Sequence, residues 1–223
     1  MGVTNPSTQC PACLGDDFRS LFRIEAGELP GYPEDAAVYA CDDCAHEWDT
    51  QHLSYVQHSE VSPAWVDALG DLYATVYAEP PYCEGPDEVR GFRAGLPEEA
   101  TRPGFALITA HDGDTLVGAA YGWTMERGRW WKRADRQPPA DVLDADKLAV
   151  LEWLVRPAHR RRGVGAELLR RLLDGRPEPY ATLASNPESA ARDIYERAGW
   201  VQVGESETPW GAHMHLLVLR LGR

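Results

Sequence analysis

One turn in the second half of the chain constrains the fold more than any other feature. Residues 147–155 are mostly apolar and predict a buried strand, which ends before Pro157 because proline cannot continue the hydrogen-bond ladder. Residues 165–174 carry apolar side chains at helical spacing. The turn between them includes Arg160, Arg161, Arg162 and Gly163, and a second glycine, Gly165, opens the helix. A buried strand that turns tightly into a helix is typical of α/β proteins.

This turn has the composition of a phosphate site. The first N–H groups of a helix have no intrahelical acceptor, and the helix dipole adds partial positive charge there. Glycine lets the backbone approach a ligand closely, and the arginines add fixed charge. A Walker loop is excluded because no Gly-Lys-Ser/Thr follows, and the dinucleotide fingerprint lacks its third glycine. The turn therefore predicts a pyrophosphate site, with a basic surface turn at a helix start as the alternative.

Helices and strands alternate through the remainder of residues 59–223. Apolar periodicity, turn residues and caps predict helices over 63–77, 87–96 and 188–197, and strands over 105–110, 115–121, 181–184, 200–204 and 214–220. This order predicts an α/β (or α+β) fold in which helices flank a mixed sheet.

Two motifs in this order resemble those of the GNAT superfamily of N-acetyltransferases. The pattern Val155-x-Pro-x-x-Arg-x-x-Gly-x-Gly165 is similar to the family's coenzyme A loop, and the stretch from Asn186 through Tyr195 to Trp200 is similar to its second motif. The stretch Val76–Tyr82 resembles the loop between the first two helices of bacterial members. The resemblance covers about residues 60–221. It implies the GNAT acyl-CoA N-acyltransferase fold, acetyl-CoA as cosubstrate, and direct acetyl transfer to a primary amine in a ternary complex.

The resemblance also implies where acetyl-CoA binds. The coenzyme would lie in a splayed notch between strand 148–155 and strand 181–184, and its amide-rich arm would satisfy the backbone groups that the splay leaves unpaired. Asn186 is also placed to cap a helix, which is the structural alternative for that residue. We expect contacts with the coenzyme from Leu154, Val155, Arg160, Arg161, Arg162, Gly163, Val164, Gly165, Ala166, Asn186 and Tyr195.

Acetyl transfer needs a neutral amine, a stabilised oxyanion and a protonated leaving thiolate. Glu152 is the only acid in its strand and lies three residues before Val155, where many family members carry a glutamate that faces the acceptor. We expect Glu152 to act as the general base, directly or through a water, or else to orient the substrate. Tyr195 matches the family tyrosine that approaches the coenzyme sulfur, and we expect it to be the general acid. The alternative for Tyr195 is an ordinary core tyrosine.

The acceptor site is expected beside these two residues. Residues 125–139, which include Trp130 and Trp131, form a long loop that either lines the site or packs onto the sheet. An acidic, aromatic pocket favours a cationic small molecule, and a protein lysine or N-terminal amine is the alternative acceptor. A non-catalytic acyl-CoA sensor is the alternative from another functional class. The expected lining consists of Glu79, Tyr82, Tyr121, Trp123 and Glu152.

The overall charge restricts the partners. The chain has a formal net charge of −13, which repels a nucleic-acid backbone. No apolar run is long enough to span a bilayer, and no basic start followed by an apolar stretch suggests a signal peptide. We therefore expect a cytoplasmic protein with no nucleic-acid or membrane partner, and a homodimer is possible.

The first 58 residues contain two CxxC pairs and few large aliphatic residues. Two such turns can place four thiolates around one ion, which favours a structural, tetrahedral Zn²⁺ site and resembles a zinc ribbon. His46 is an alternative ligand, and redox dithiols are the alternative for a single pair. We expect a zinc-ribbon-like segment over 1–58 and the acetyltransferase domain over 59–223, with the ribbon packing on that domain, joining a dimer or walling the acceptor site. The expected ligands are Cys10, Cys13, Cys41 and Cys44.

Overall fold

A seven-stranded mixed sheet organises most of the chain. The computed structural model describes residues 18–24, 36–41, 47–49, 53–208 and 211–222, with side chains from residue 53 onwards. Only the β7–β8 pair is parallel, and the other neighbours in this sheet are antiparallel. In spatial order the strands are β4 (Leu53–His58), β5 (Ala106–Asp112), β6 (Thr115–Met125), β7 (Lys147–Val155), β8 (Tyr180–Ser185), β10 (His213–Arg220) and β9 (Val201–Glu207).

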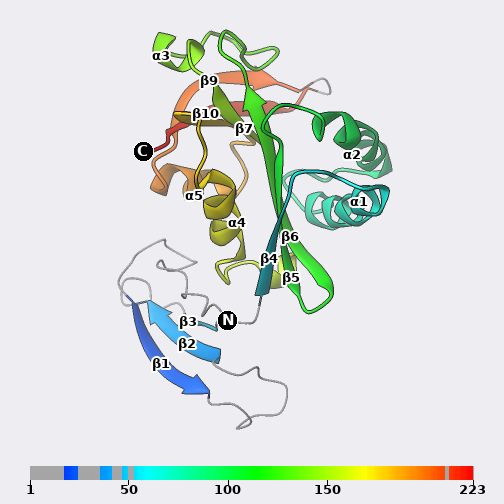
Figure 1. Cartoon of the computed structure of the whole chain (residues 1–223), viewed down its shortest axis with the longest axis vertical. Helices are drawn as coiled ribbons and strands as arrows, with labels where there is room; N and C mark the ends of the chain where they lie inside the picture. Colours follow the sequence, from blue (N-terminus) through cyan, green and yellow to red (C-terminus); the bar gives the residue numbers. More distant parts are fainter. Residues whose placement is uncertain (1–17, 25–35, 42–46, 50–52, 209–210, 223) are drawn as a thin grey trace.

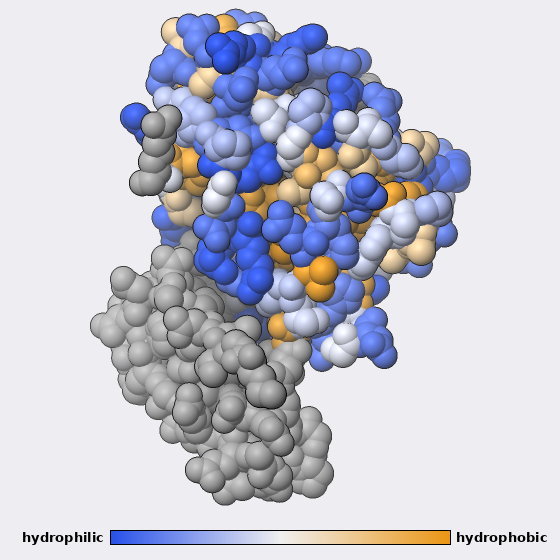
Figure 2. Space-filling model, in the orientation of Figure 1, coloured by the Kyte–Doolittle hydropathy of each residue, from blue (hydrophilic) through white to orange (hydrophobic). Residues whose placement is uncertain are grey.

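Helices cover both faces of this sheet (Figure 1). On one face lie α1 (Pro63–Tyr77) and α2 (Pro86–Glu99), and on the other lie α4 (Val164–Leu173) and α5 (Ala191–Arg197). The short helix α3 (Ala140–Leu143) follows the long loop after β6. Apolar side chains are visible in the middle of the face drawn in Figure 2, surrounded by hydrophilic ones. The mixed sheet with flanking helices confirms the predicted fold class for the acetyltransferase region.

The sequence explains why α1 forms and which side it buries. The Oγ of Ser62 accepts a hydrogen bond from the backbone N–H of Trp65 at 3.3 Å, and Pro63 occupies the first turn. Leu69, Leu72 and Val76 follow at helical spacing and are buried in one core cluster together with Leu107 and Leu154 of the sheet. The helix therefore begins at its cap and packs its apolar stripe on the sheet, as the periodicity predicts.

The opposite face has its own core. Val164, Leu168 and Leu172 of α4 pack with Leu148 and Val150 of β7 in a second cluster. The two cores place β7 at the centre of the fold, with one apolar layer on each side.

None of the helices in the described ranges is long and apolar enough to cross a membrane.

The strand β4 corrects the assignment of residues 53–58. These residues were predicted to belong to the N-terminal segment, but the structure pairs Leu53 with Asp112 and His58 with Leu107 in the large sheet. The sheet therefore begins at Leu53. Division of the chain into a ribbon segment and an acetyltransferase domain stays a prediction, and on this pairing its boundary falls before β4.

A separate three-stranded antiparallel sheet lies in the N-terminal part, in the order β1 (Phe18–Ile24), β2 (Ala36–Cys41) and β3 (Glu47–Asp49). Strand β2 runs directly into the second CxxC pair. Cys10, Cys13 and Cys44 lie outside the described residues, and only the backbone of Cys41 is described. Zinc coordination by these cysteines, with His46 as the alternative ligand, therefore stays a prediction.

Candidate active site

A gap between two neighbouring strands is the central feature of the site. The parallel strands β7 and β8 pair only from Lys147 to Ala149 and from Tyr180 to Thr182. Beyond these pairs β7 runs on to Val155 without a strand partner on that edge within the described residues. Buried backbone groups need hydrogen-bond partners, so this edge fits an extended, amide-rich ligand such as the pantetheine arm.

The arginine- and glycine-rich turn directly follows this gap. Gly163 caps α4 in the left-handed conformation, with φ of 76°, and Arg161 is also left-handed, with φ of 60°. The first bond into the helix runs from the N–H of Glu167 to the carbonyl of Gly163, at 3.0 Å. The preceding N–H groups of the first turn have no intrahelical acceptor. The turn therefore has the backbone geometry of an anion cradle, and it fits a pyrophosphate.

Trp153 fixes this turn against the strand. Its Nε1 donates a hydrogen bond to the carbonyl of Gly165 at 2.8 Å. A Cβ at Gly165 would lie only 2.7 Å from Cζ2 of the same ring. Glycine is therefore required here for close packing of the helix on the indole, a role that the sequence motif did not reveal.

Arg160 connects the turn to the loop after α1. Its Nη1 lies 2.7 Å from the Oε2 of Glu79, and its Nε donates to the carbonyl of Val155 at 3.2 Å. Glu79 was predicted to line the acceptor site, and Arg160 was predicted to bind the coenzyme. The structure brings the two side chains together, so the predicted coenzyme and acceptor elements share one ion pair.

A β-bulge directs Glu152. In the β6–β7 pairing Tyr121 lies opposite Glu152 while Gly122 lies opposite Val150, so Leu151 is an extra residue in β7. Before the bulge, Val150 packs in the cluster that contains α4. After it, Leu154 packs in the cluster that contains α1. Glu152 consequently faces the α1 side, where strict alternation would have put it under α4.

The carboxyl group of Glu152 accepts a hydrogen bond from Tyr77 and has a raised pKa. The hydroxyl of Tyr77, the last residue of α1, donates a hydrogen bond to its Oε2 at 2.7 Å. Burial raises the pKa of Glu152 to about 8; the Tyr77 hydrogen bond opposes this shift, and the carboxylates of Glu99 and Glu84 add to it. A carboxyl group with this pKa can accept a proton near neutral pH.

Two further tyrosine–glutamate pairs lie around it. Tyr73 donates to Glu84 at 2.5 Å, and Tyr121 donates to Glu99 at 2.7 Å. Burial raises the pKa of both Glu84 and Glu99, against the effect of their tyrosine donors. Three carboxylates therefore collect on the α1–α2 side of the sheet. We name the residues Tyr73, Tyr77, Tyr121, Glu84, Glu99 and Glu152 the tyrosine–glutamate cluster.

Tyr195 approaches from the other side of the sheet. It is buried on α5 and its ring packs against Trp153, with centroids 5.3 Å apart, and against Trp200, at 5.7 Å. Burial raises its pKa, and the nearby Tyr82 and Glu152 raise it further. Tyr195 therefore lies in the core on the α4 side of the sheet, close enough to Glu152 for the two side chains to interact electrostatically.

The structure places three other predicted site residues, Tyr82, Trp123 and Asn186, in different surroundings. Tyr82 lies beside the site, because its hydroxyl interacts with Ser189 ahead of α5 and its pKa is raised by burial and by Glu152. Trp123 packs on the α1–α2 core and has Arg102 over its ring at 5.6 Å. The Oδ1 of Asn186 accepts a hydrogen bond from the N–H of Glu188 at 2.8 Å within the turn before α5, and Asn186 does not cap that helix, whose N-cap is Ala190.

The long loop after β6 packs onto the sheet. Trp130 joins a small cluster with Val142, Tyr180 and Val218, and Trp131 donates to the hydroxyl of Thr182 at 2.9 Å. The loop was expected either to line the acceptor site or to pack onto the sheet. The main contacts of both tryptophans are those of packing onto the sheet.

Sequence reasoning missed Tyr77, Tyr73, Glu84 and Glu99. Tyr73 fits the apolar stripe of α1 and Tyr77 is its last residue, while the glutamates stand in α2 and the loop before it, with no motif around them. The hydrogen bonds join positions that are between 11 and 75 residues apart, so no local pattern could have indicated them.

Comparison with known proteins identifies the family. The sequence profile of the acetyltransferase (GNAT) family matches residues 66–200, which include the gap, the turn, Glu152 and Tyr195. The chain belongs to the GNAT family of acetyltransferases. This GNAT protein is accordingly an acetyl-CoA-dependent N-acetyltransferase, as its two motifs suggested. No protein with a curated description matches the sequence.

Solved structures share the fold of this GNAT protein. An aminoglycoside 6'-acetyltransferase type Ii is 16% identical with a TM-score of 0.54, covering 76% of this chain and 98% of that one. An aminoglycoside 6'-N-acetyltransferase complexed with coenzyme A is 13% identical with a TM-score of 0.51, covering 76% and 98%. The ribosomal-protein-S18-alanine N-acetyltransferase from Escherichia coli is 14% identical with a TM-score of 0.50, covering 76% and 96%. At these identities the likeness concerns the fold and leaves the acceptor open.

Proposed function

We propose that this enzyme transfers the acetyl group of acetyl-CoA directly to a primary amine of a cationic small molecule, in a ternary complex. The observation that carries the proposal is the placement of Glu152. It lies on the stretch of β7 that has parted from β8, burial raises its pKa to about 8, and it interacts electrostatically with Tyr195. A base and an acid close to one strand edge suit a single-step transfer between two bound substrates.

The coenzyme side uses the backbone. The pantetheine arm binds along β7 at Leu154 and Val155, and the first turn of α4, from Gly163 to Ala166, binds the pyrophosphate. Arg161 and Arg162 add positive charge, while Arg160 holds the Glu79 loop near the same turn. The side-chain amide nitrogen of Asn186 donates to the arm. These contacts position the thioester beside Glu152 and Tyr195.

The transfer then proceeds with balanced protons. Glu152 takes a proton from the ammonium group of the acceptor, and the free amine nitrogen attacks the thioester carbonyl carbon. The C–N bond forms, a backbone N–H of β7 stabilises the oxyanion, and the C–S bond breaks as the intermediate collapses. Tyr195 gives its proton to the leaving thiolate. The acylated nitrogen then gives up its second proton, through water, to the Tyr195 phenolate, and the proton on Glu152 passes to solvent. Both groups are restored, and the reaction releases one proton overall.

The charge of the site supports a cationic acceptor. Glu84, Glu99 and Glu152 each accept a hydrogen bond from a tyrosine, and a bound ammonium ion would favour the ionised form of each carboxyl group. Tyr82 and Trp123 add partly buried aromatic groups to the same region. Acidic groups and aromatic faces together attract an ammonium ion.

An acceptor screen tests the proposal. Purified protein is incubated with acetyl-CoA and a library of amines, and mass spectrometry records every component that gains one acetyl group. The control is Arg162→Glu, which reverses the charge of an exposed side chain in the coenzyme turn. We expect acetylation of small amines with more than one positive charge by the natural protein and a large loss with the control.

Two results would contradict the small-molecule proposal. Acetyl groups found on protein lysines or N-termini, with none on the amine library, would identify a protein acceptor. Tight acetyl-CoA binding in calorimetry without turnover on amines or lysine-bearing proteins would identify a non-catalytic sensor.

We further propose that Cys10, Cys13, Cys41 and Cys44 bind one structural Zn²⁺. The spacing of the two CxxC pairs supports this, and so does β2, which runs directly into the second pair. Elemental analysis tests it: protein without stoichiometric zinc, together with a disulfide between any two of these cysteines, would contradict the assignment.

A further inference from the structure

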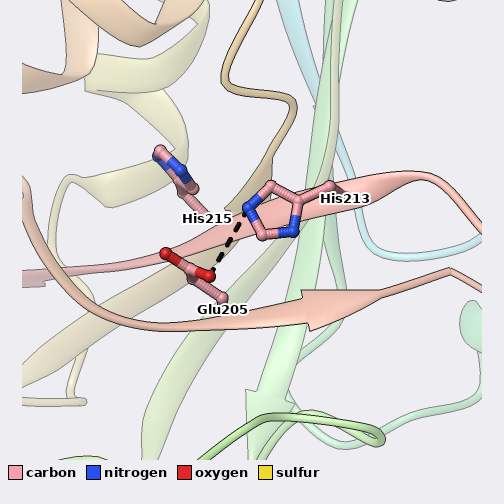
Figure 3. A group of neighbouring side chains, drawn as sticks. All are labelled: Glu205, His213 and His215. Atoms are coloured by element: carbon pink, nitrogen blue, oxygen red, sulfur yellow. Dashed lines mark ion pairs between the residues drawn. The ribbon is translucent and has the colours of Figure 1, made fainter.

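Two histidines and a glutamate meet at the end of the large sheet, outside the proposed acetyl-transfer site. His213 and His215 are two residues apart on β10 and so lie on the same face, and Glu205 on β9 pairs directly opposite His215. Figure 3 shows the three side chains on one side of these strands, with Glu205 and His213 directed toward each other. One potential ligand atom from each residue lies within 4.8 Å of the other two.

The distance between the side chains of Glu205 and His213 matches the spacing of two ligands on one metal ion. The Nε2 of His213 and the Oε2 of Glu205 lie 3.5 Å apart, which is longer than a well-formed charged hydrogen bond. Two ligands bound at about 2.1 Å to one tetrahedral ion would be about 3.4 Å apart. The pair is therefore already at the distance that a shared metal ion requires.

Arg192 of α5 is the group that an ion must displace. Its Nε donates to the Nδ1 of His215 at 3.3 Å, which is a long hydrogen bond. The same guanidinium forms an ion pair with Glu196 at 2.7 Å and contacts the side chain of Gln202 at 3.3 Å. Arg192 therefore keeps two partners if it releases His215.

We propose that Glu205, His213 and His215 form a binding site for one divalent transition-metal ion, Zn²⁺ or an ion of the same class. Two imidazoles and a carboxylate are a ligand set suited to zinc, and three protein ligands leave the fourth position to water. The strand spacing supplies the geometry, because alternate residues of β10 and the residue opposite on β9 share one face of the sheet. The site is independent of the four N-terminal cysteines.

A zinc titration of the reduced full-length protein tests the proposal. Protein and a chromogenic chelator compete for Zn²⁺, which gives the number of bound ions and their affinity. The natural protein is compared with His213→Gln, whose side chain is exposed, and with the control His111→Gln on β5. Any zinc on the cysteines is common to all three proteins, so differences report on the β9–β10 site alone.

We expect His213→Gln to bind one zinc ion fewer than the natural protein, and His111→Gln to bind the same number. Equal stoichiometry and affinity in all three proteins would overturn the proposal. Arg192→Gln provides a second measurement, because removal of the competing guanidinium should tighten binding at this site. Weaker zinc binding by Arg192→Gln would also contradict the geometry argued above. Circular dichroism verifies that each variant is folded.

Discussion

Replacement of Glu152 by glutamine tests the proposed chemistry most directly. The substitution keeps the size of the side chain and leaves an oxygen to accept from Tyr77, but it removes the site of protonation. If Glu152 is the base, the variant should bind both substrates and transfer the acetyl group slowly. If Glu152 only orients the acceptor, the main effect should be on the KM for the amine.

The size and pH dependence of the effect follow from its environment. Removal of a general base typically lowers the rate by about 10²–10⁴-fold. With a pKa of about 8, Glu152 is ionised in roughly a tenth of the molecules at neutral pH. We therefore expect kcat/KM of the natural enzyme to rise roughly tenfold per pH unit up to about 8 and then to level off. In Glu152→Gln this rise of kcat/KM with pH should disappear. Any pH dependence that comes from deprotonation of the acceptor amine should remain.

The pH dependence of folding stability gives an independent check on the raised pKa of Glu152. Stability should fall over the pH range in which activity rises. The pKa of Glu152 in the fold lies above its ordinary value of 4.5, so the folded state binds this proton more tightly than the unfolded state. The stability that this group contributes is therefore complete below about pH 4.5 and is lost as the pH rises through about 8. Glu152→Gln should escape this loss and unfold at a higher temperature than the natural protein in alkaline buffer.

The assay follows release of the coenzyme thiol with a chromogenic disulfide, over a pH series, using the best amine from the acceptor screen. Glu126→Gln, at an exposed position just after β6, is the matched control and should behave like the natural enzyme. Activity of Glu152→Gln within a few-fold of the natural enzyme, with an unchanged pH limb near 8, would refute the role of Glu152 as base.

Three further substitutions probe the other parts of the site. Tyr195→Phe removes the proposed acid, so kcat should fall by about 10²-fold while the KM for acetyl-CoA changes little, as measured by thiol release. Gly165→Ala places a Cβ 2.7 Å from the Trp153 ring, and thermal unfolding should show a loss of about 1–3 kcal/mol together with weaker coenzyme A binding. Cys41→Ser should remove one zinc ion in elemental analysis without loss of coenzyme A binding, because every residue proposed for the coenzyme lies between Leu154 and Tyr195. Loss of coenzyme A binding in Cys41→Ser would instead show that the N-terminal segment and the acetyltransferase region unfold as one unit.

Local signals in the sequence predicted much of the fold. The helix over residues 63–77 was predicted to the residue, because Ser62 and Pro63 mark its start and the apolar stripe defines its length. The strand–turn–helix unit around Gly163 was predicted because two different periodicities meet there. In contrast, β4 was missed: its pairing with β5 joins residues about 50 positions apart, and its sequence follows the cysteine segment without a break in composition.

The orientation of the active-site carboxylate depends on a feature that periodicity cannot predict. In strict alternation, Glu152 would share a face with Leu148 and Val150 and lie under the apolar side of α4, where an ionised carboxylate would be costly to bury. The extra residue Leu151 reverses the alternation, so that Glu152 instead meets the hydroxyl of Tyr77. The family resemblance indicated a glutamate that faces the acceptor, and the bulge is the physical reason why this chain can place one there. Because the bulge also falls where β7 has just parted from β8, the same stretch of strand offers its edge to the coenzyme and its carboxylate to the acceptor.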